Sequence, residues 1–331
     1  MKAVLARRHG PPESLVVEEV DAMHAGPGEV IVRVHTSAVN FPDTLIIENK
    51  YQFKPALPFS PGGEVAGTIG QVGAGVEGFA VGDRVIAVCG WGGFAEEVRT
   101  VPAKLVRLPE GIDMEAAAAL VITYGTSHYA LKDRAAIQPG ETLLVLGAAG
   151  GTGISAVELG KLMGARVIAA ASTDEKLALC RAHGADDTIN YATEDLRERI
   201  KALTGGRGVD VVYDPVGGSY TEPALRSMAW RGRYLVIGFT AGEIPKPALN
   251  LVLLKGCAIV GVFYGGFAQA EPARYEAFMK ELVGLLAQGR IKPAITARFP
   301  LEEAALALRL VADRKATGKI MLTTALGRSA R

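Results

Sequence analysis

The sequence predicts an α/β protein with two parts: a doubly wound parallel sheet and a second, mostly antiparallel β domain. The chain has 331 residues, about twice the usual length of a single domain. Its first third shows short alternating strands broken by Gly and Pro, whereas apolar strands and helices alternate after about residue 123. Forty glycines, about 12% of the chain against a usual value of about 7%, indicate many tight turns or close backbone approaches.

The first domain is expected over residues 1–123. Glu29–His35 alternates apolar and polar residues, as a half-buried strand does. Glu64–Ile69 and Asp83–Val88 are similar short runs bounded by glycines. This pattern predicts a compact antiparallel β domain with long connecting loops.

The C-terminal segment, residues 265–331, is expected to return to that first domain. It contains two helical patterns, at Tyr275–Gln288 and around Glu302–Arg314, and ends in the strand-like Lys319–Thr323. About sixty residues cannot easily form a core alone, so we expect this segment to complete the β domain.

The middle segment, residues 124–264, has the pattern of a doubly wound sheet. Thr142–Leu146 is a continuous apolar strand, as buried parallel sheets require, and a helix follows that ends near Gly164. Five further strands are expected, with helices between most of them: Arg166–Ala171, Thr188–Asn190, Val209–Asp214, Tyr234–Phe239 and Ala258–Val262. Six strands with alternating helices predict a doubly wound parallel sheet.

A glycine-rich turn lies between the first of these strands and its helix. It fits the pattern G-x-G-x-x-G with Ala148 in place of the first glycine. The second glycine lets a pyrophosphate approach the backbone, the third lets helix and strand pack closely, and the helix N-terminus supplies free N–H groups. We expect five residues to bind the cofactor here: Ala149, Gly150, Gly151, Thr152 and Gly153. The turn therefore predicts a Rossmann dinucleotide-binding domain; a merely structural turn is the alternative.

The end of the second strand of this domain indicates which dinucleotide binds. NAD enzymes place a carboxylate about 20 residues after the glycines to hold the ribose hydroxyls. Here Ser172 and Lys176 stand instead, and both can donate to a 2′-phosphate; Tyr191 is expected to cover the same pocket. Asp174 is expected in the first helical turn, where its charge favours the helix dipole. The residues predict NADPH; the alternative is that Ser172 caps the helix and Lys176 is solvated.

Composition excludes several classes of function. Lys plus Arg number 36 and Asp plus Glu 35, so no global field favours nucleic acid or an anionic membrane. No apolar run approaches the roughly 20 residues that span a bilayer, and Met1–Leu15 lacks the apolar stretch of a secretory signal. Cys89, Cys180 and Cys257 lie far apart, which fits a reducing, cytoplasmic location rather than a disulfide scaffold.

Several short motifs, taken together, resemble a known family. They are Asn40-Phe41, Tyr51, Pro61–Glu64, Val81–Val85 and Val212–Gly217. With the glycine-rich turn they make the chain similar, over essentially its whole length, to the zinc-free quinone oxidoreductase branch of the medium-chain dehydrogenase/reductase superfamily. The resemblance implies a GroES-like catalytic domain beside the Rossmann domain, with catalysis in the cleft between domains.

The resemblance also implies that no metal is bound. Zinc members of the superfamily carry Cys where Asn40 stands and Gly-His-Glu where Gly62, Gly63 and Glu64 stand, and Cys89 is alone where they have a four-cysteine lobe. Zinc needs three or four ligands in a defined geometry. Without a Lewis acid, the expected reaction is hydride delivery from NADPH to quinones or α,β-unsaturated carbonyl compounds, which spread the incoming charge themselves.

The family pattern suggests roles for individual residues. Asn40 is expected near the nicotinamide ribose and the substrate, with a turn residue as the alternative. Tyr51 is expected to donate a hydrogen bond to the substrate oxygen, or else to pack in its loop. Thr126 is expected near the nicotinamide, or as a helix cap. Leu45 stands where relatives often have a second tyrosine, which leaves the proton donor open.

Four residues follow the fifth and sixth strands of the Rossmann domain, where strand ends approach a cofactor: Phe239, Val262, Phe263 and Gly265. We expect a backbone role for them, with core packing as the alternative. The apolar strand Ala258–Val262 is expected at the edge of the sheet, and an uncovered edge of this kind favours a homodimer.

Two other functions stay open. One is a short-chain enoyl-CoA reductase of the acryloyl-CoA type, which would need cations such as Lys50, Lys54 or Arg274 at the cleft mouth. The other is an NADPH-binding structural or interaction protein with negligible turnover. The fold cannot choose between them, because function is determined by the residues of the pocket.

Overall fold

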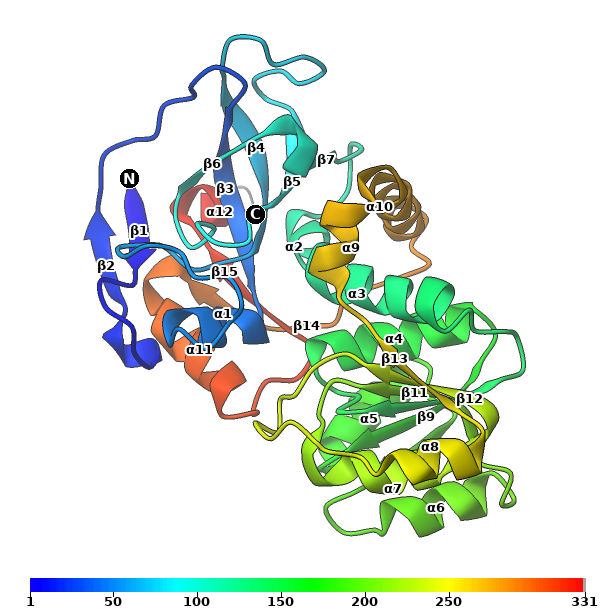
Figure 1. Ribbon diagram of the computed structural model, residues 1–331. Coiled ribbons are helices and arrows are strands. Elements are labelled where there is room, and N and C mark those ends of the chain that lie inside the picture. The colour runs from blue at the N-terminus through cyan, green and yellow to red at the C-terminus, as the bar shows by residue number, and fades with distance from the viewer. Residues whose placement is uncertain (330–331) are drawn as a thin grey trace. The chain divides into compact units, whose positions relative to one another are not determined.

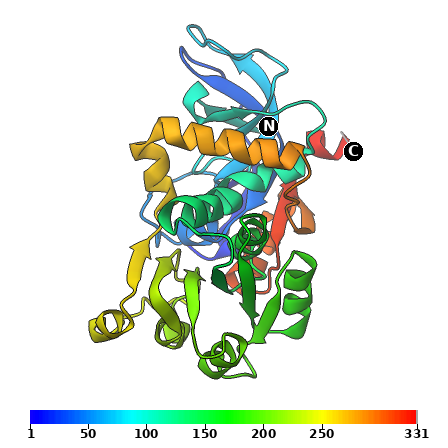
Figure 2. The ribbon, with the colours of Figure 1, turned by 90° about the vertical axis from the view of Figure 1, so that its right-hand side faces the viewer.

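The computed structural model describes residues 1–329, and the chain divides into two compact units (Figure 1). Unit 1 comprises Met1–Ile122 and the C-terminal segment from Met279, and unit 2 comprises Thr123–Phe278. The boundary falls within helix α10 (Pro272–Ala287), which is one continuous helix in Figure 2. The domain boundaries expected at residues 123 and 264 stay predictions.

Unit 2 contains the predicted doubly wound sheet. Its six parallel strands lie in the order β10-β9-β8-β11-β12-β13, which places the first strand of the motif in the middle. The strands are β8 (Thr142–Leu146), β9 (Arg166–Ala171), β10 (Asp187–Asn190), β11 (Val209–Asp214), β12 (Met228–Val236) and β13 (Ala258–Gly261). All five residues of β8 are buried, which explains its uninterrupted apolar sequence. The order reverses between β8 and β11, the place where doubly wound sheets bind dinucleotides.

Most helices of unit 2 connect its strands, whereas α3 (Gly125–His128) precedes the first strand and α9 (Tyr264–Ala270) follows the last. The connecting helices are α4 (Gly151–Leu162), α5 (Asp174–Ala182), α6 (Leu196–Leu203), α7 (Thr221–Arg226) and α8 (Leu249–Lys255). A core of buried side chains such as Leu144, Ile168 and Val212 fills the space beneath them. Two π-helical turns, Leu120–Tyr124 and Tyr129–Arg134, flank α3.

Unit 1 has a seven-stranded sheet in the order β14-β15-β3-β4-β5-β7, with β6 also paired to β3. The strands are β3 (Val30–Val39), β4 (Glu64–Val72), β5 (Arg84–Val88), β6 (Glu97–Thr100), β7 (Leu105–Arg107), β14 (Ile295–Pro300) and β15 (Lys319–Thr323). All pairs are antiparallel except β14 with β15. The fold class predicted from the sequence is therefore confirmed.

The remaining elements of unit 1 are a two-stranded sheet and four helices. These are β1 (Lys2–Leu5), β2 (Val16–Glu19), α1 (Phe41–Ile47), α2 (Met114–Ala118), α11 (Ala304–Ala312) and α12 (Ala325–Ser329). Short 3-10 turns lie at Pro12–Ser14, Pro102–Lys104 and Leu301–Glu303, and a fourth in unit 2 at Gly218–Tyr220. Strand β15 pairs with β3, so that Ile320 lies opposite Val39. This pairing brings the C-terminal segment to the strand that ends at Asn40.

One expected strand has different bounds in the structure, and one strand was not expected. The strand expected at Tyr234–Phe239 is β12, which starts six residues earlier and ends at Val236. Its exposed Arg231, with a φ of 62°, interrupts the apolar pattern that marks a buried strand. Strand β14 was not expected, because its alternating exposed residues resemble a loop.

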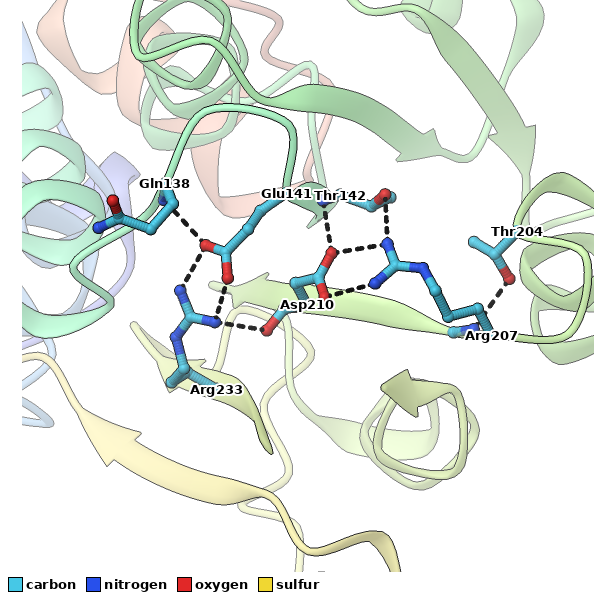
Figure 3. A network of polar contacts seen from close by, with 8 residues as sticks. Gln138, Glu141, Thr142, Thr204, Arg207, Asp210 and Arg233 are labelled. Carbon is cyan, nitrogen blue, oxygen red and sulfur yellow. Dashed lines mark hydrogen bonds and ion pairs between the residues drawn. The ribbon is translucent and has the colours of Figure 1, made fainter. Parts of the chain in front are cut away.

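A polar network connects the starts of β8 and β11 to the middle of β12 in unit 2 (Figure 3). Arg233 of β12 binds both oxygens of Glu141, at 2.8 and 2.6 Å. Arg207 binds both oxygens of Asp210 at 2.8 Å, and Asp210 also accepts the backbone N–H of Thr142, at 2.8 Å. The arginines hold the pKa of Glu141 and Asp210 below their ordinary values.

We expect Arg233→Met to destabilise unit 2 by about 1–3 kcal/mol, because it leaves a half-buried carboxylate without its bidentate partner. The pKa of Glu141 is lowered on folding, so the pair stabilises the protein above about pH 4.5 and the effect is lost as pH falls through the lowered value. Urea unfolding followed by Trp230 fluorescence in a Trp91→Phe background measures this.

The matched control is Arg226→Met, which removes an exposed ion pair with Glu222 in α7 and is expected to cost about 0.5 kcal/mol or less. An equal loss for both variants, or a difference between wild type and Arg233→Met that does not shrink in acid, would contradict the account.

Candidate functional site

The glycine-rich turn of unit 2 forms a helix N-terminus suited to an anion. Helix α4 starts at Gly151 with Gly150 as its N-cap, and no side chain caps it. A Cβ on Gly153 would lie 2.3 Å from the carbonyl oxygen of Gly147, so only glycine fits there. The close approach packs α4 onto β8 and leaves its first-turn N–H groups available to a phosphate. Ala149 and Thr152 lie in the same turn.

A hydroxyl and a cation meet at the end of β9. The Lys176 Nζ donates to Ser172 Oγ at 3.4 Å. Thr173, not Ser172, caps α5 by accepting the backbone N–H of Lys176 at 3.3 Å, so the capping alternative for Ser172 does not apply. Asp174 lies in the first turn as expected, and its carboxylate accepts from Asn190 Nδ2 at 2.9 Å. The carboxylate is thereby held by the neighbouring strand.

Tyr191 lies beside this pair. Its backbone N–H donates to the carbonyl of Ala171, the last residue of β9, at 3.1 Å. Its ring lies 4.4 Å from that of Tyr220, centroid to centroid. The backbone of Tyr191 is therefore fixed to the end of β9, and its ring packs with Tyr220 against the core of unit 2.

The other expected cofactor residues of unit 2 differ in how deeply they are buried. Thr126 lies in α3, where the N-cap is Tyr124, so the alternative that Thr126 caps the helix does not apply. Val262 is buried, Phe239 is half-buried, and the Phe263 side chain is 55% exposed. Gly265 lies in α9 with only the Phe263 ring within 4 Å of a Cβ built on it. Core packing therefore accounts for Val262 but not for Phe263 or Gly265.

Tyr264 was missed by the sequence analysis. A Cβ added to Gly125 would lie 2.1 Å from the Tyr264 hydroxyl, so this oxygen rests directly on α3 beside Thr126. The signal available in the sequence was a tyrosine directly after Phe263 in the segment already expected to approach a cofactor.

Asn40 lies at the centre of a buried polar cluster in unit 1. Its Nδ2 donates to the carbonyl of Ala38 at 3.1 Å and to Glu64 Oε1 at 2.9 Å. Its Oδ1 accepts from Lys319 Nζ at 2.7 Å, and Lys319 also donates to Glu64 Oε1 at 3.0 Å. Asn40 is also the residue before α1, as a turn residue would be. The sequence analysis included Asn40 and Glu64 but missed Lys319.

Asp43 closes the same turn. Its two carboxylate oxygens accept the backbone N–H groups of Asn40 at 2.8 Å and of Gly62 at 3.2 Å. Burial raises the pKa of Asp43 to about 7, against the opposing effect of these N–H groups and of Lys319. The carboxyl group thus connects the Asn40 turn to the Gly62–Glu64 segment.

Tyr51 is a half-buried tyrosine of the loop after α1. Its ring packs against the core of unit 1 and lies 5.7 Å from that of Phe53. Burial, and next the charge of Asp43, raise the pKa of Tyr51 above its ordinary value of 10. The hydroxyl therefore keeps its proton at neutral pH and can act as a hydrogen-bond donor.

The side chains of unit 1 do not fit a zinc ion. Within residues 1–329 no three His, Cys, Asp or Glu side chains come together in a way that would hold a metal. Gly63 offers no side chain, and the oxygens of Asn40 and Glu64 already bind an ammonium group. Cys89 donates its thiol hydrogen to the carbonyl of Ala87 at 3.5 Å, and desolvation raises its pKa to about 12.

Family models match both parts of the chain. The "Alcohol dehydrogenase GroES-like domain" matches residues 26–110 and "Zinc-binding dehydrogenase" matches residues 151–283. The chain is 38% identical to the quinone oxidoreductase-like protein 2 homolog of Nematostella vectensis, over 98% of this chain and 89% of that protein. It is 37% identical to the quinone oxidoreductase of Pseudomonas aeruginosa, over 97% and 99% of the two chains.

A solved structure agrees with these matches. The Escherichia coli quinone oxidoreductase complexed with NADPH has a TM-score of 0.92 and 31% identity, covering 98% of this chain and 100% of that one. Fold, glycine-rich turn and matching models together define an oxidoreductase with a GroES-like and a Rossmann part. Within that class, the chain belongs to the quinone oxidoreductase family of the medium-chain dehydrogenase/reductase superfamily.

Proposed function

We propose that the protein is a zinc-independent, NADPH-dependent reductase that transfers hydride to quinones or α,β-unsaturated carbonyl compounds. The observation that carries the choice of NADPH is the Ser172–Lys176 pair at the end of β9. A hydroxyl and an ammonium group favour a 2′-phosphate, which a carboxylate at this place would repel. The E. coli neighbour, crystallised with NADPH, supports the same choice.

The residues of unit 2 suit the rest of this cofactor. The uncapped first turn of α4, at Gly151, Thr152 and Gly153, is suited to the pyrophosphate. Tyr191 supplies an aromatic surface beside the 2′-phosphate residues, and Thr126 with the Phe263–Gly265 segment is proposed for the nicotinamide end. When bound, NADPH supplies the hydride. The chain's own residues bind and orient the cofactor and the substrate.

Independence from zinc is supported by the cluster around Asn40. The positions that carry Cys and His in zinc members are here an amide already bonded to Lys319 and a glycine without a side chain. A quinone or an activated alkene delocalises the incoming negative charge itself, so a single hydrogen-bond donor suffices. We propose that Asn40 and Tyr51 contact the substrate or the reacting end of the cofactor, with the Tyr51 hydroxyl as that donor.

An enoyl-CoA reductase is the second candidate, and two contacts weigh against it. Lys50 is in an ion pair with Glu48 at 2.5 Å, and Arg274 bonds Asp133 and Glu271. Lys50 and Arg274 therefore already have acidic partners within the chain. An NADPH-binding structural protein with negligible turnover is the candidate from another class.

A spectrophotometric screen of NADPH oxidation tests the proposal, with NADH in parallel and with a chelator present. The acceptors are small quinones, simple enones, and acryloyl- and crotonyl-CoA. We expect NADPH-preferring turnover of quinones or enones that survives the chelator. Turnover confined to CoA thioesters would move the protein to the enoyl reductases, and tight NADPH binding without any turnover would support the structural role.

We also propose that the protein forms a homodimer through the edge of the unit 2 sheet near residues 258–262. Edge strand β13 has no partner on its outer side among the described strands. Beside it lie large exposed apolar side chains: Trp230 (74% exposed), Leu249 (76%), Leu253 (79%) and Leu254 (72%). Contiguous exposed apolar surface next to a free strand edge is typical of an interface.

Leu253→Glu is expected to shift the protein from dimer to monomer, because it places a charge in the middle of this apolar surface. Sedimentation velocity at several concentrations measures the effect. Leu306→Glu, on the exposed face of α11 in unit 1, is the control and should leave the association state unchanged. A monomeric wild type, or a Leu253→Glu variant that stays dimeric, would contradict this interface.

None of the helices in residues 1–329 combines the length and the apolar character that crossing a bilayer requires. The three free cysteines support the cytoplasm as the proposed compartment.

A further inference from the structure

Lys319, the first residue of β15, is a fully buried cation. Its side chain is 2% exposed and that of its partner Glu64 is 0% exposed. The ammonium group donates to three oxygens: Asn40 Oδ1 at 2.7 Å, Glu64 Oε1 at 3.0 Å and the carbonyl of Val39 at 3.3 Å. All three of its donors are therefore used, which is the condition for burying such a charge.

The contacts of Lys319 and Glu64 fix the orientation of the Asn40 amide. An ammonium group has donors only, so the atom of Asn40 that faces it must be Oδ1. An ionised carboxylate has acceptors only, so the atom that faces Glu64 must be Nδ2. A flipped amide would oppose like groups at both contacts. The pair thus allows Asn40 one orientation.

The hydrogen bonds of the Asn40 amide leave one acceptor site of its oxygen unused. Both Nδ2 hydrogens are used, by the carbonyl of Ala38 and by Glu64. Oδ1 accepts one bond from Lys319 and keeps its second lone pair. The amide can therefore act on a ligand only as an acceptor.

We propose that Lys319 is a positioning residue for hydride transfer, which holds the Asn40 amide with its oxygen available as a hydrogen-bond acceptor for the reacting end of the cofactor. Lys319 also ties β15, from the C-terminal segment, to the turn between β3 and α1. The inference rests on the proposed reductase function. Lys319 acts through Asn40 and does not itself contact the substrate.

The charge of Lys319 is compensated within the cluster. Its ammonium group stands between Asn40 and Glu64 and donates to an oxygen of each. Its charge is balanced by Glu64, whose other oxygen accepts the backbone N–H of Ile122 at 2.7 Å.

The test is a set of variants assayed for NADPH oxidation by the best quinone or enone acceptor. Lys319→Met alone leaves the negative charge of Glu64 buried without a counter-charge and could unfold unit 1. The variant to assay is therefore the double variant Lys319→Met with Glu64→Gln, in which no buried charge remains at this pair. The control is Lys315→Met, an exposed lysine of unit 1 that pairs with Asp313. Binding of 2′,5′-ADP, which reports on the adenosine-phosphate part of the nucleotide site in unit 2 and not on the Asn40 cluster, is measured for every variant.

For the double variant we expect kcat to fall about 10- to 100-fold while the Kd of 2′,5′-ADP stays within about twofold. The primary isotope effect on kcat with NADPH deuterated at the transferred hydrogen should rise, because the hydride step becomes slower. In an Asn40→Ala background the double variant should cause no further loss, since Lys319 acts through Asn40.

Three outcomes overturn the inference. Unchanged kcat in the double variant, or a loss that adds in full to that of Asn40→Ala, would overturn the role of Lys319 and leave the reductase function intact. Absence of any NADPH oxidation by the wild-type protein would overturn the proposed function, and the role of Lys319 with it. A drop in kcat accompanied by an equal loss of 2′,5′-ADP binding would indicate general damage to the fold and would likewise overturn it.

Discussion

Replacing Ser172 by Asp and Lys176 by Met is expected to lower kcat/KM for NADPH by about 100-fold or more, while kcat/KM for NADH stays equal or rises. Charge-assisted hydrogen bonds contribute about 1.5–3 kcal/mol each, and the new carboxylate repels the 2′-phosphate in addition. The structure favours a local effect, because Thr173, which is left intact, is the residue that caps α5.

Steady-state kinetics with both nucleotides, together with the Kd of 2′,5′-ADP, measure this change in preference. Lys161→Met is the control: this lysine lies at the end of α4 and pairs with Asp186 on the surface. An undiminished preference for NADPH in the double variant would refute the assignment of the 2′-phosphate to Ser172 and Lys176. A wild type that prefers NADH would refute it as well.

The substitution Glu64→Leu is expected to destabilise unit 1 by about 3–5 kcal/mol. It leaves the ammonium group of Lys319 buried without a counter-charge, and breaking one half of a buried pair costs about this amount. It also removes the acceptors for Asn40 Nδ2 and for the backbone N–H of Ile122. Urea unfolding followed by Trp91 fluorescence in a Trp230→Phe background reports on unit 1 alone.

Adding Lys319→Met to Glu64→Leu should recover more than half of the lost stability, since no charge is then buried at the pair. Glu302→Leu, which removes an exposed partner of Lys2, is the control and is expected to cost about 1 kcal/mol or less. A loss of unfolding free energy for Glu64→Leu no larger than that of the control would show that the buried cluster does not stabilise unit 1 as described.

The strand–turn–helix of the proposed nucleotide site could be predicted because its signals are local. The apolar run of β8, the glycines after it and the start of α4 are adjacent in sequence, and their spacing alone requires a strand–turn–helix. The same holds for Ser172 and Lys176, which lie one helical turn apart after β9. Asp174 was ambiguous in sequence, and its bond to Asn190 depends on how β10 pairs with β9.

The cluster in unit 1 could be predicted only in part, because its members meet through strand register. Lys319 and Glu64 are 255 residues apart, and they meet because β15 pairs with β3, which in turn pairs with β4. No local pattern gives that register. The available signal was a lysine at the start of the otherwise apolar strand Lys319–Thr323, a residue type that is buried only when paired.

The measurement that tests the central claim most directly is the rate of NADPH oxidation by a small quinone, with protein whose metal content has been determined by mass spectrometry. We expect turnover that prefers NADPH over NADH in protein with less than about one-tenth equivalent of zinc, and no increase when zinc is added, because the oxygens of Asn40 and Glu64 already bind the ammonium group of Lys319. Activity that scales with bound zinc, or no oxidation of NADPH by quinones or enones at all, would contradict the account.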